Sequence, residues 1–386
     1  MRIATVIAGV FCLFVVLFDA FQTIIVPRRA MGKLRLTNLF YGLTWRPWIY
    51  FAKLVRQPNK RESVLSYYGP MSLILLLMVW AAGLVVGFGL LYSSLGRPFH
   101  DGLESSVIRT DLYVSGTTLF TLGLGDVTPQ TSVARVLTIL EAGTGLGFLA
   151  VIMGYFPVLY SAFSRREVSI ALLDARAGSP PTAAELMRRH SHQGAEESLA
   201  LLLNEWERWS AELLESHISY PLLCYFRSQH TNQSWLASLT AILDTSSLLI
   251  AGVQGHEARQ AQLTFAMARH ALVDLAQIFN VSSASPAVDR LPQEQYDELY
   301  GRLCQSGVAM CRDGHSYDRL RELRVLYEGY AEGLARYLHM PLPPWMPPAP
   351  KLDNWERVAR IRAQSELSQD SVGANEEHFI EPHHDF

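Results

Sequence analysis

Residues 117–129 read Thr-Thr-Leu-Phe-Thr-Leu-Gly-Leu-Gly-Asp-Val-Thr-Pro, a loop with glycine at alternate positions near its centre. Apolar segments flank this loop on both sides: residues 70–93 carry no charge, and residues 136–163 carry only Glu141. Each segment is longer than the roughly 20 helical residues that cross a hydrocarbon core. The sequence therefore predicts a loop held between two membrane-spanning helices.

A third apolar run precedes this pair. Residues 3–26 carry one charge, Asp19, and basic residues follow the run rather than precede it. With no obvious small-residue cleavage site, we expect an uncleaved anchor rather than a signal peptide. Residues 164–386 are mixed in character and predict a soluble part. The net charge of −3 averages two unlike parts and indicates no partner, and we expect no nucleic-acid binding.

Positive charge gathers between the first two apolar runs. Residues 27–68 carry nine Lys or Arg residues against one acid, Glu62. The positive-inside rule places such a loop in the cytoplasm. The N-terminus is then outside, residues 94–130 are outside, and Arg165 and Arg166 return inside. We expect a multi-pass protein of the plasma (inner) membrane with a cytoplasmic C-terminal part.

The basic segment, residues 28–68, also has a helical apolar pattern at Leu36, Leu39, Phe40 and Leu43. Aromatic residues follow this pattern, which favours an amphipathic segment at the level of the lipid headgroups. A plain cytoplasmic helix is the alternative.

Residues 104–120, just before the glycine loop, are too short and too polar to span a bilayer. Non-helical backbone at membrane depth is tolerated only where protein buries it or water lines it. A short helix that enters from outside, followed by an extended return strand, satisfies this condition. The negative end of such a helix would face a dehydrated cation.

The return strand, Thr121 to Gly125, has the composition of a cation filter. Gly123 and Gly125 permit backbone angles closed to other residues. Stacked rings of carbonyl oxygens replace the hydration shell of K⁺. We expect the Thr121 hydroxyl to contribute, together with the carbonyls of four residues: Thr121, Leu122, Gly123 and Leu124. Asp126 is expected to support the strand from behind. A nucleotide-binding turn would instead follow a strand of a soluble βαβ unit.

Residues 70–163 resemble the two-helix pore domain of the potassium channel superfamily, in its bacterial type. The resemblance rests on the Thr-x-Gly-x-Gly-Asp filter, the Thr128-Pro129 pair and a glycine-bearing inner helix. It implies a homotetramer, because four loops build one filter and this chain has one. Leu122 stands where Val or Ile is usual. Leu124 replaces a usual Tyr or Phe and removes a bracing ring, so a weakly selective cation channel is an alternative.

The inner helix is predicted over residues 131–163, roughly 45 to 50 Å long. Gly143, Gly145 and Gly147 cluster near its middle. Gly145 falls where the family usually carries its gating hinge, although glycine can also serve close packing. Pro157 should kink the cytoplasmic end of the helix and shape an inner gate.

Glu141 is an ionisable group within a membrane span, for which a functional role is the default. Facing the cavity, it would attract cations. Facing the pore helix, it could accept hydrogen bonds from Thr117 or Thr118 and support the filter, which we favour. For Asp19, an interhelical hydrogen bond is the simplest expectation.

Residues 164–340 predict a helical bundle. Thr182 and Glu185 form a capping-box pattern, and apolar residues recur at helical spacing over several segments: 195–217, 233–252, 256–279, 292–309 and 315–338. His217 and His230 lack the partners of a metal site, so packing is expected. The four cysteines predict neither a disulfide framework nor zinc. No nucleotide-binding glycine motif, cyclic-nucleotide pocket or voltage sensor is recognisable.

The predicted fold is therefore an all-α membrane protein with three transmembrane helices, a re-entrant pore helix and filter, and a cytoplasmic helical bundle. Its segments are an N-terminal transmembrane helix (1–27), the basic segment (28–68), a pore domain (69–163), a cytoplasmic helical domain (164–340), and a Pro-rich linker with a disordered tail (341–386).

The predicted function is a tetrameric K⁺ channel, not an enzyme, gated at the inner helix by an unknown stimulus. Membrane lipid and a regulatory ligand on the cytoplasmic domain are possible partners. A membrane-anchored helical sensor or scaffold with a non-conducting pore is the remaining alternative.

Overall fold

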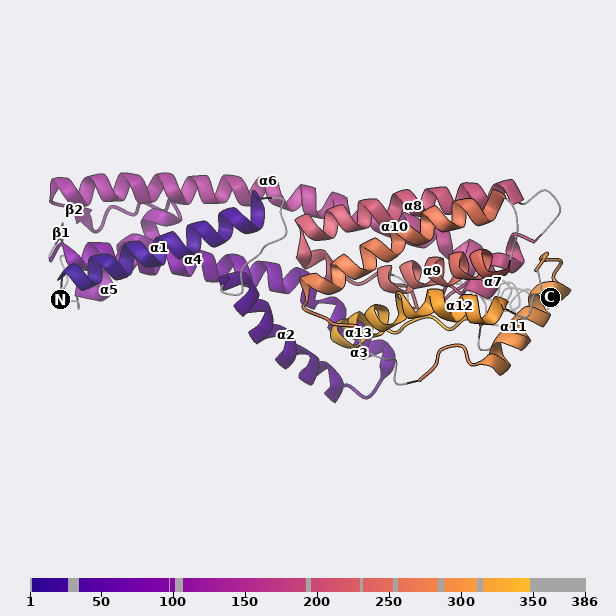
Figure 1. Ribbon diagram of the computed structural model, residues 1–386. Coiled ribbons are helices and arrows are strands. Elements are labelled where there is room, and N and C mark those ends of the chain that lie inside the picture. Colours follow the sequence, from indigo (N-terminus) through magenta and orange to yellow (C-terminus); the bar gives the residue numbers. More distant parts are fainter. Residues whose placement is uncertain are drawn as a thin grey trace, which may run out of the picture. The chain divides into compact units, whose positions relative to one another are not determined.

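The computed structural model describes residues 2–26, 35–96, 98–100, 107–191, 196–229, 232–252, 256–283, 288–310 and 315–347. The chain divides into two compact units. The first unit holds Met1–Arg165 together with Glu215–Arg227, and the second holds Arg166–Leu214 and the chain from Ser228 onward. Each unit is mainly helical (Figure 1).

The first unit contains most of the apolar segments. Its helices are α1 (Arg2–Ile24), α2 (Leu36–Leu54), α3 (Pro58–Ser66), α4 (Tyr68–Ser94), α5 (Val107–Leu119) and the first part of α6 (Ser132–Ala177). Two short strands, β1 (Phe99–His100) and β2 (Thr128–Pro129), pair antiparallel, and a 3₁₀ helix, η1 (Pro221–Tyr225), joins the unit from far along the chain.

Helices α1 and α4 lie side by side along their length because small residues let their backbones approach (Figure 1). A methyl group at Gly83 would lie 2.6 Å from a Val16 side-chain carbon, and one at Gly9 would lie 2.9 Å from the Gly87 carbonyl oxygen. Buried Trp80 extends this packing. No larger residue fits at these glycines without displacing the partner helix.

Asp19 forms the interhelical hydrogen bonds predicted for it. Its carboxylate accepts from Trp80 Nε1 of α4 at 2.9 Å and from the Thr37 hydroxyl of α2 at 2.6 Å. Arg35 Nε lies 3.7 Å from the same carboxylate. A single buried acid thus ties α1, α2 and α4 together.

Helix α2 has two apolar faces. Phe40, Trp45 and Ala52 are buried against the first unit, whereas Leu43 and Phe51 are more than 60% exposed. The helix predicted around Leu36–Leu43 is therefore present and longer than expected. An exposed apolar face is what a helix at a lipid headgroup layer requires.

Four helical stretches of the described residues are long and apolar enough to cross a membrane: Arg2–Ile24, Pro58–Ser94, Ser132–Ala177 and Trp235–Gly252. The sequence predicted three. In the fourth, 94% of the apolar stretch is buried within the protein, against 11% for Ser132–Ala177. Helix α6 also exceeds its predicted end at residue 163 by continuing through Pro157 to Ala177.

The second unit packs its helices around α9 (Trp235–Gly252), which is buried on all sides. Its other helices are α7 (Ala183–Arg189), α8 (Glu196–Ser219), α10 (His256–Ile278), α11 (Gln293–Gln305), α12 (Ser316–Val325) and α13 (Glu328–Leu338). The last turn of α8 and the first part of α6 are assigned to the first unit, and the remainder of each helix is assigned to the second.

The sequence predicted one helical segment over 315–338. This prediction is wrong about continuity, because α12 and α13 are separate helices. The break falls at Tyr327, whose backbone φ of −136° is not helical. The Tyr327 hydroxyl donates to Asp244 Oδ1 at 2.6 Å in the interior. This inward hydrogen bond replaces the continuation of the helix.

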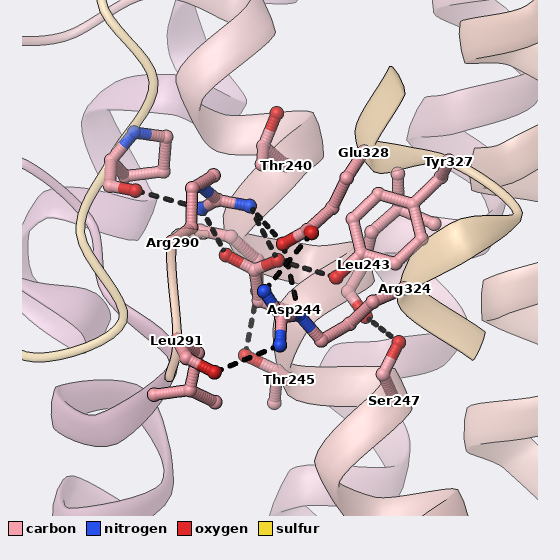
Figure 2. Close-up of polar contacts among 12 residues, drawn as sticks. Thr240, Leu243, Asp244, Thr245, Ser247, Arg290, Leu291, Arg324, Tyr327 and Glu328 are labelled. Carbon is pink, nitrogen blue, oxygen red and sulfur yellow. Dashed lines mark hydrogen bonds and ion pairs between the residues drawn. The ribbon is translucent and has the colours of Figure 1, made fainter. Parts of the chain in front are cut away.

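A buried ion cluster surrounds Asp244 of α9 (Figure 2). Arg290 donates to both carboxylate oxygens of Asp244, at 3.2 and 2.7 Å, and to Glu328 at 3.1 Å. Arg324 donates to Glu328 and to the Leu291 carbonyl. Burial alone would lower the pKa of Arg290, but the charge of Asp244 raises it above its ordinary value. The arginines therefore remain charged inside the unit.

Residues 341–347 form no helix or strand and are packed within the second unit, and the extended linker predicted over 341–350 stays a prediction. The Pro343 carbonyl accepts from Arg290 at 2.7 Å, and Trp345 is 2% exposed. The Arg290 and Arg324 guanidinium carbons lie 5.7 and 5.6 Å from the Trp345 ring. The predicted disordered tail, residues 365–386, lies outside the described residues.

Candidate functional site

The glycine loop leaves the C-terminal end of α5 and returns to β2. Helix α5 covers Val107–Leu119, close to the short helix predicted over 104–120. The return ends where Phe99 pairs with Pro129 and His100 pairs with Thr128. The loop is therefore fixed at one end by a helix and at the other by a two-stranded sheet.

Every second residue of the loop has a positive φ angle: Thr121 at 56°, Gly123 at 54° and Gly125 at 78°. A methyl group at Gly123 or Gly125 would meet no atom within 4 Å in one chain. Glycine is required there by backbone conformation, since non-glycine residues disfavour positive φ. Thr121 adopts such an angle without being glycine, which costs energy.

The hydrogen bonds of the loop fix the direction of its carbonyl groups. The Leu122 and Gly123 N–H groups both donate to the Thr117 carbonyl, at 2.8 and 3.4 Å. In a planar trans peptide, N–H and C=O point in opposite directions. The carbonyl groups of Thr121 and Leu122, which share those peptide units, therefore point away from α5.

Thr117 and Thr118 thus support the loop through their main chains. The Thr118 carbonyl accepts from the Thr121 N–H at 3.0 Å, and the Thr117 hydroxyl donates within its own helix to the Val114 carbonyl at 3.0 Å. The sequence identified both threonines, but as hydrogen-bond donors to Glu141 rather than as main-chain acceptors for the loop.

The loop is exposed on the side away from α5. Leu122 and Leu124 are 61% and 62% exposed, and Thr121, Gly123 and Gly125 are also exposed.

Asp126 closes the loop at its outer end. Its carboxylate accepts a hydrogen bond from the Tyr113 hydroxyl of α5 at 2.7 Å. Sequence analysis selected Asp126 but missed Tyr113. Tyr113 precedes Thr117 by one helical turn, so both residues lie on the face of α5 that meets the loop.

Glu141 of α6 lies behind α5 and is fully buried. It accepts hydrogen bonds from the Ser115 hydroxyl at 2.5 Å and from the Tyr92 hydroxyl of α4 at 2.7 Å. The prediction that Thr117 or Thr118 donates a hydrogen bond to Glu141 is therefore wrong. At 100° per residue, Thr117 faces nearly opposite to Ser115, and Thr118 lies one turn closer to the loop.

These bonds make Glu141 the junction of α4, α5 and α6. Ser115 has a second acceptor, the Val85 carbonyl of α4 at 3.0 Å. Beside this junction, Asp111 of α5 accepts from the Ser93 hydroxyl at 2.6 Å. Sequence analysis did not identify Asp111, Ser93 or Tyr92. Helix α5 is therefore held to α4 and α6 by hydroxyl–carboxylate pairs.

Gly145 is a close-packing position. A methyl group there would lie 2.1 Å from the Leu119 carbonyl oxygen at the end of α5, whereas Gly143 and Gly147 have no neighbour within 4 Å. Of the two roles considered for these glycines, packing is what Gly145 performs in this conformation. A hinge at Gly145 and a kink at Pro157 stay predictions.

The sequence analysis also considered two histidines and four cysteines. His217 is buried with its Nδ1 3.1 Å from the Ser216 hydroxyl, and His230 lies outside the described residues. Among the residues that the structure describes, no three His, Cys, Asp or Glu side chains are grouped to hold a metal ion. Cys12, Cys224 and Cys304 form no disulfide among the described residues, and Cys311 is not described.

Comparison with known proteins supports the interpretation of the loop and its flanking helices. Residues 74–161 match a protein family described as an ion channel, which confirms the resemblance found over 70–163. The chain is also 25% identical over 279 residues to the uncharacterized membrane protein YdjJ of Bacillus subtilis (strain 168), covering 71% of this chain and 79% of that protein. No solved structure matches the chain significantly. The ion-channel match includes α5, the loop and most of the membrane part of α6.

Proposed function

We propose that four copies of the chain form a channel that conducts K⁺ passively. The filter is the strand from Thr121 to Gly125, and the permeant ion binds the carbonyl oxygens of Thr121, Leu122, Gly123 and Leu124 with the Thr121 hydroxyl. Asp126 and Glu141 hold the filter from behind. The channel opens and closes at the inner helix α6, with Gly145 and Pro157 as the positions of bending.

The direction of the loop carbonyls carries this proposal. Two N–H groups of the loop are occupied by the Thr117 carbonyl, so the oxygens of the same peptide units face the open side. Hard monovalent cations lose their hydration shell to rings of such oxygens. One chain supplies one side of a ring, and three further copies would complete it and cover Leu122 and Leu124.

The membrane arrangement follows from charge and burial. Helices α1, α4 and α6 are the three spans, because the fourth candidate, α9, is covered by protein. We infer that the ends of these helices next to the basic residues, before α4 and after the apolar part of α6, lie in the cytoplasm of a plasma (inner) membrane, with the N-terminus outside. Helix α2 then lies against lipid headgroups.

A weakly selective cation channel is the second candidate, and Leu124 favours it. A leucine cannot donate a hydrogen bond to the structure behind the filter, and this side chain is 62% exposed in one chain. A less rigid ring discriminates less between cations of different size. The Tyr113–Asp126 hydrogen bond is a separate brace that remains in place.

Flux and reversal potential in liposomes test these proposals. The purified full chain is reconstituted with K⁺ on one side and Na⁺ on the other. A reversal potential close to that of K⁺ is expected, and a value near zero supports the second candidate. Conduction should be lost in Gly123→Ala, whose φ of 54° alanine disfavours, and retained in Gly116→Ala, which has open space around it. A wild-type chain that passes no cation under any condition contradicts both channel proposals.

A further inference from the structure

The segment Tyr220–Arg227, here called the docking segment, lies between α8 and α9 in the sequence but packs within the first unit. Pro221 begins the 3₁₀ helix η1. Leu223 and Cys224 are fully buried, and Tyr225 is 4% exposed. Burial of this extent shows a tightly packed element rather than a connecting loop.

Tyr225 is enclosed by three aromatic side chains of the first unit. Its ring stacks on Tyr41 with centroids 5.4 Å apart and planes at 12°. Trp45 and Tyr68 meet it edge-on at 5.0 and 5.3 Å. Offset and edge-to-face pairs at these distances stabilise the contact beyond the apolar area that they bury.

The next two residues extend the contact to α4 and α6. A methyl group at Gly69 would lie 2.7 Å from the Phe226 ring, so only glycine leaves room for this side chain. Phe226 also meets the ring of Phe163 on α6, with centroids 5.5 Å apart. Arg227, whose side chain is 5% exposed, forms an ion pair with Glu62 of α3.

The other end of the docking segment reaches a second point on α6, where Tyr220 meets the ring of Tyr155 at 5.6 Å. Tyr155 and Phe163 lie about 15 and 27 Å beyond Gly145 along the helix axis, at 1.5 Å per residue. The docking segment therefore holds the end of α6 that is distant from the filter, on both sides of Pro157.

We propose that the docking segment couples the C-terminal part of the chain to the gate, with Tyr225 and Phe226 as positioning residues for α6. The proposal rests on the proposed function. Helix α8 leads directly into the docking segment, so a force on α8 acts on Tyr155 and Phe163. Movement of α6 at these residues must separate ring pairs in which the α6 member, Tyr155 or Phe163, is buried. The contacts thereby set the ratio of open to closed channels without touching the filter.

Single-channel recording from reconstituted full-length protein tests this coupling in two matched pairs. Gly69→Ala displaces Phe226, whereas Gly42→Ala adds the same methyl group where nothing lies within 4 Å. Tyr225→Ala removes the enclosed ring, whereas Tyr67→Ala removes a ring that is 63% exposed. Tyr225→Phe keeps the ring contacts and should lie closer to wild type than Tyr225→Ala.

The first member of each pair should change the open-to-closed ratio about two- to tenfold, the effect of losing one or two aromatic contacts. Single-channel conductance and reversal potential should stay at wild-type values. Ratios equal to those of the control variants overturn the coupling. A changed conductance overturns it too, because the segment would then act on the filter. A silent wild-type channel instead contradicts the proposed function.

Discussion

The two units both bury carboxylates, but they satisfy them with different partners. In the first unit, Glu141 accepts from the neutral hydroxyls of Tyr92 and Ser115. In the second unit, Asp244 is held by a charged arginine that also serves Glu328 (Figure 2). Neutral donors fill the acceptor sites of a carboxylate without cancelling its charge. A guanidinium group fills the same sites and also cancels the charge.

The difference shows how each unit would respond to the loss of one partner. Removing an arginine leaves uncompensated negative charge in a protein interior, which is among the most costly single changes. Removing the carboxylate from the first network leaves neutral hydroxyls without their preferred acceptor, which costs less. The second unit therefore depends on a few buried charges, and this network of the first unit depends on smaller contacts.

Loss of Arg290 should have the largest effect. Arg290→Met leaves Asp244 and Glu328 buried with less positive charge, and we expect a loss of about 3–5 kcal/mol of stability in the second unit. Thermal unfolding with hydrogen exchange of α9 measures it. Arg336→Met is the control, because its pair with Glu332 is exposed and contributes little. Equal effects of the two changes would contradict the importance of the cluster.

A methyl group at Gly145 tests the close packing of the first unit. Gly145→Ala should cost about 1–3 kcal/mol, since a well-packed site must shift to accept it. Gly143→Ala has open space and should be neutral or slightly stabilising. Cation flux and thermal stability of the detergent-solubilised protein measure both variants. If the Gly145 variant matches the Gly143 variant, the contact with Leu119 does not hold the pore helix.

Substitution of Glu141 tests the neutral network directly. Glu141→Gln replaces one acceptor with a donor, and a loss of about 1 kcal/mol is expected because Ser115 keeps the Val85 carbonyl as an acceptor. The comparison variant is Glu212→Gln on α8, whose side chain is 54% exposed. Unchanged conductance together with unchanged filter stability would remove Glu141 from the support of the filter.

The smallest expected effect is a pH dependence at α7. Hydrogen bonds from Arg188 lower the pKa of Glu185 to about 2 from its ordinary value of 4.5. The stabilisation is therefore complete above pH 4.5 and is lost as pH falls toward 2. The melting temperatures of wild type and Glu185→Gln should converge over this interval. A constant difference between them would assign the effect to another group.

Local signals made much of the fold predictable. The apolar runs, the alternating glycines and the Thr182 cap of α7 are patterns within a few residues, and the cap is confirmed by the hydrogen bond from the Glu185 N–H. The partners of Glu141 were not predictable, because they depend on which face of α5 meets α6. The break at Tyr327 depends on Asp244, 83 residues away. The burial of Tyr225 likewise depends on residues far earlier in the chain.

The bonds from the loop to Thr117 have a thermodynamic consequence. Each of the two peptide units involved has its N–H on α5 and its oxygen on the open side. A cation that draws electron density from such an oxygen makes the N–H a stronger donor, since hydrogen bonds in series polarise one another. Ion occupancy and attachment of the loop are then linked equilibria. In the proposed channel, the permeant ion would be a ligand that stabilises the folded form of its own binding site.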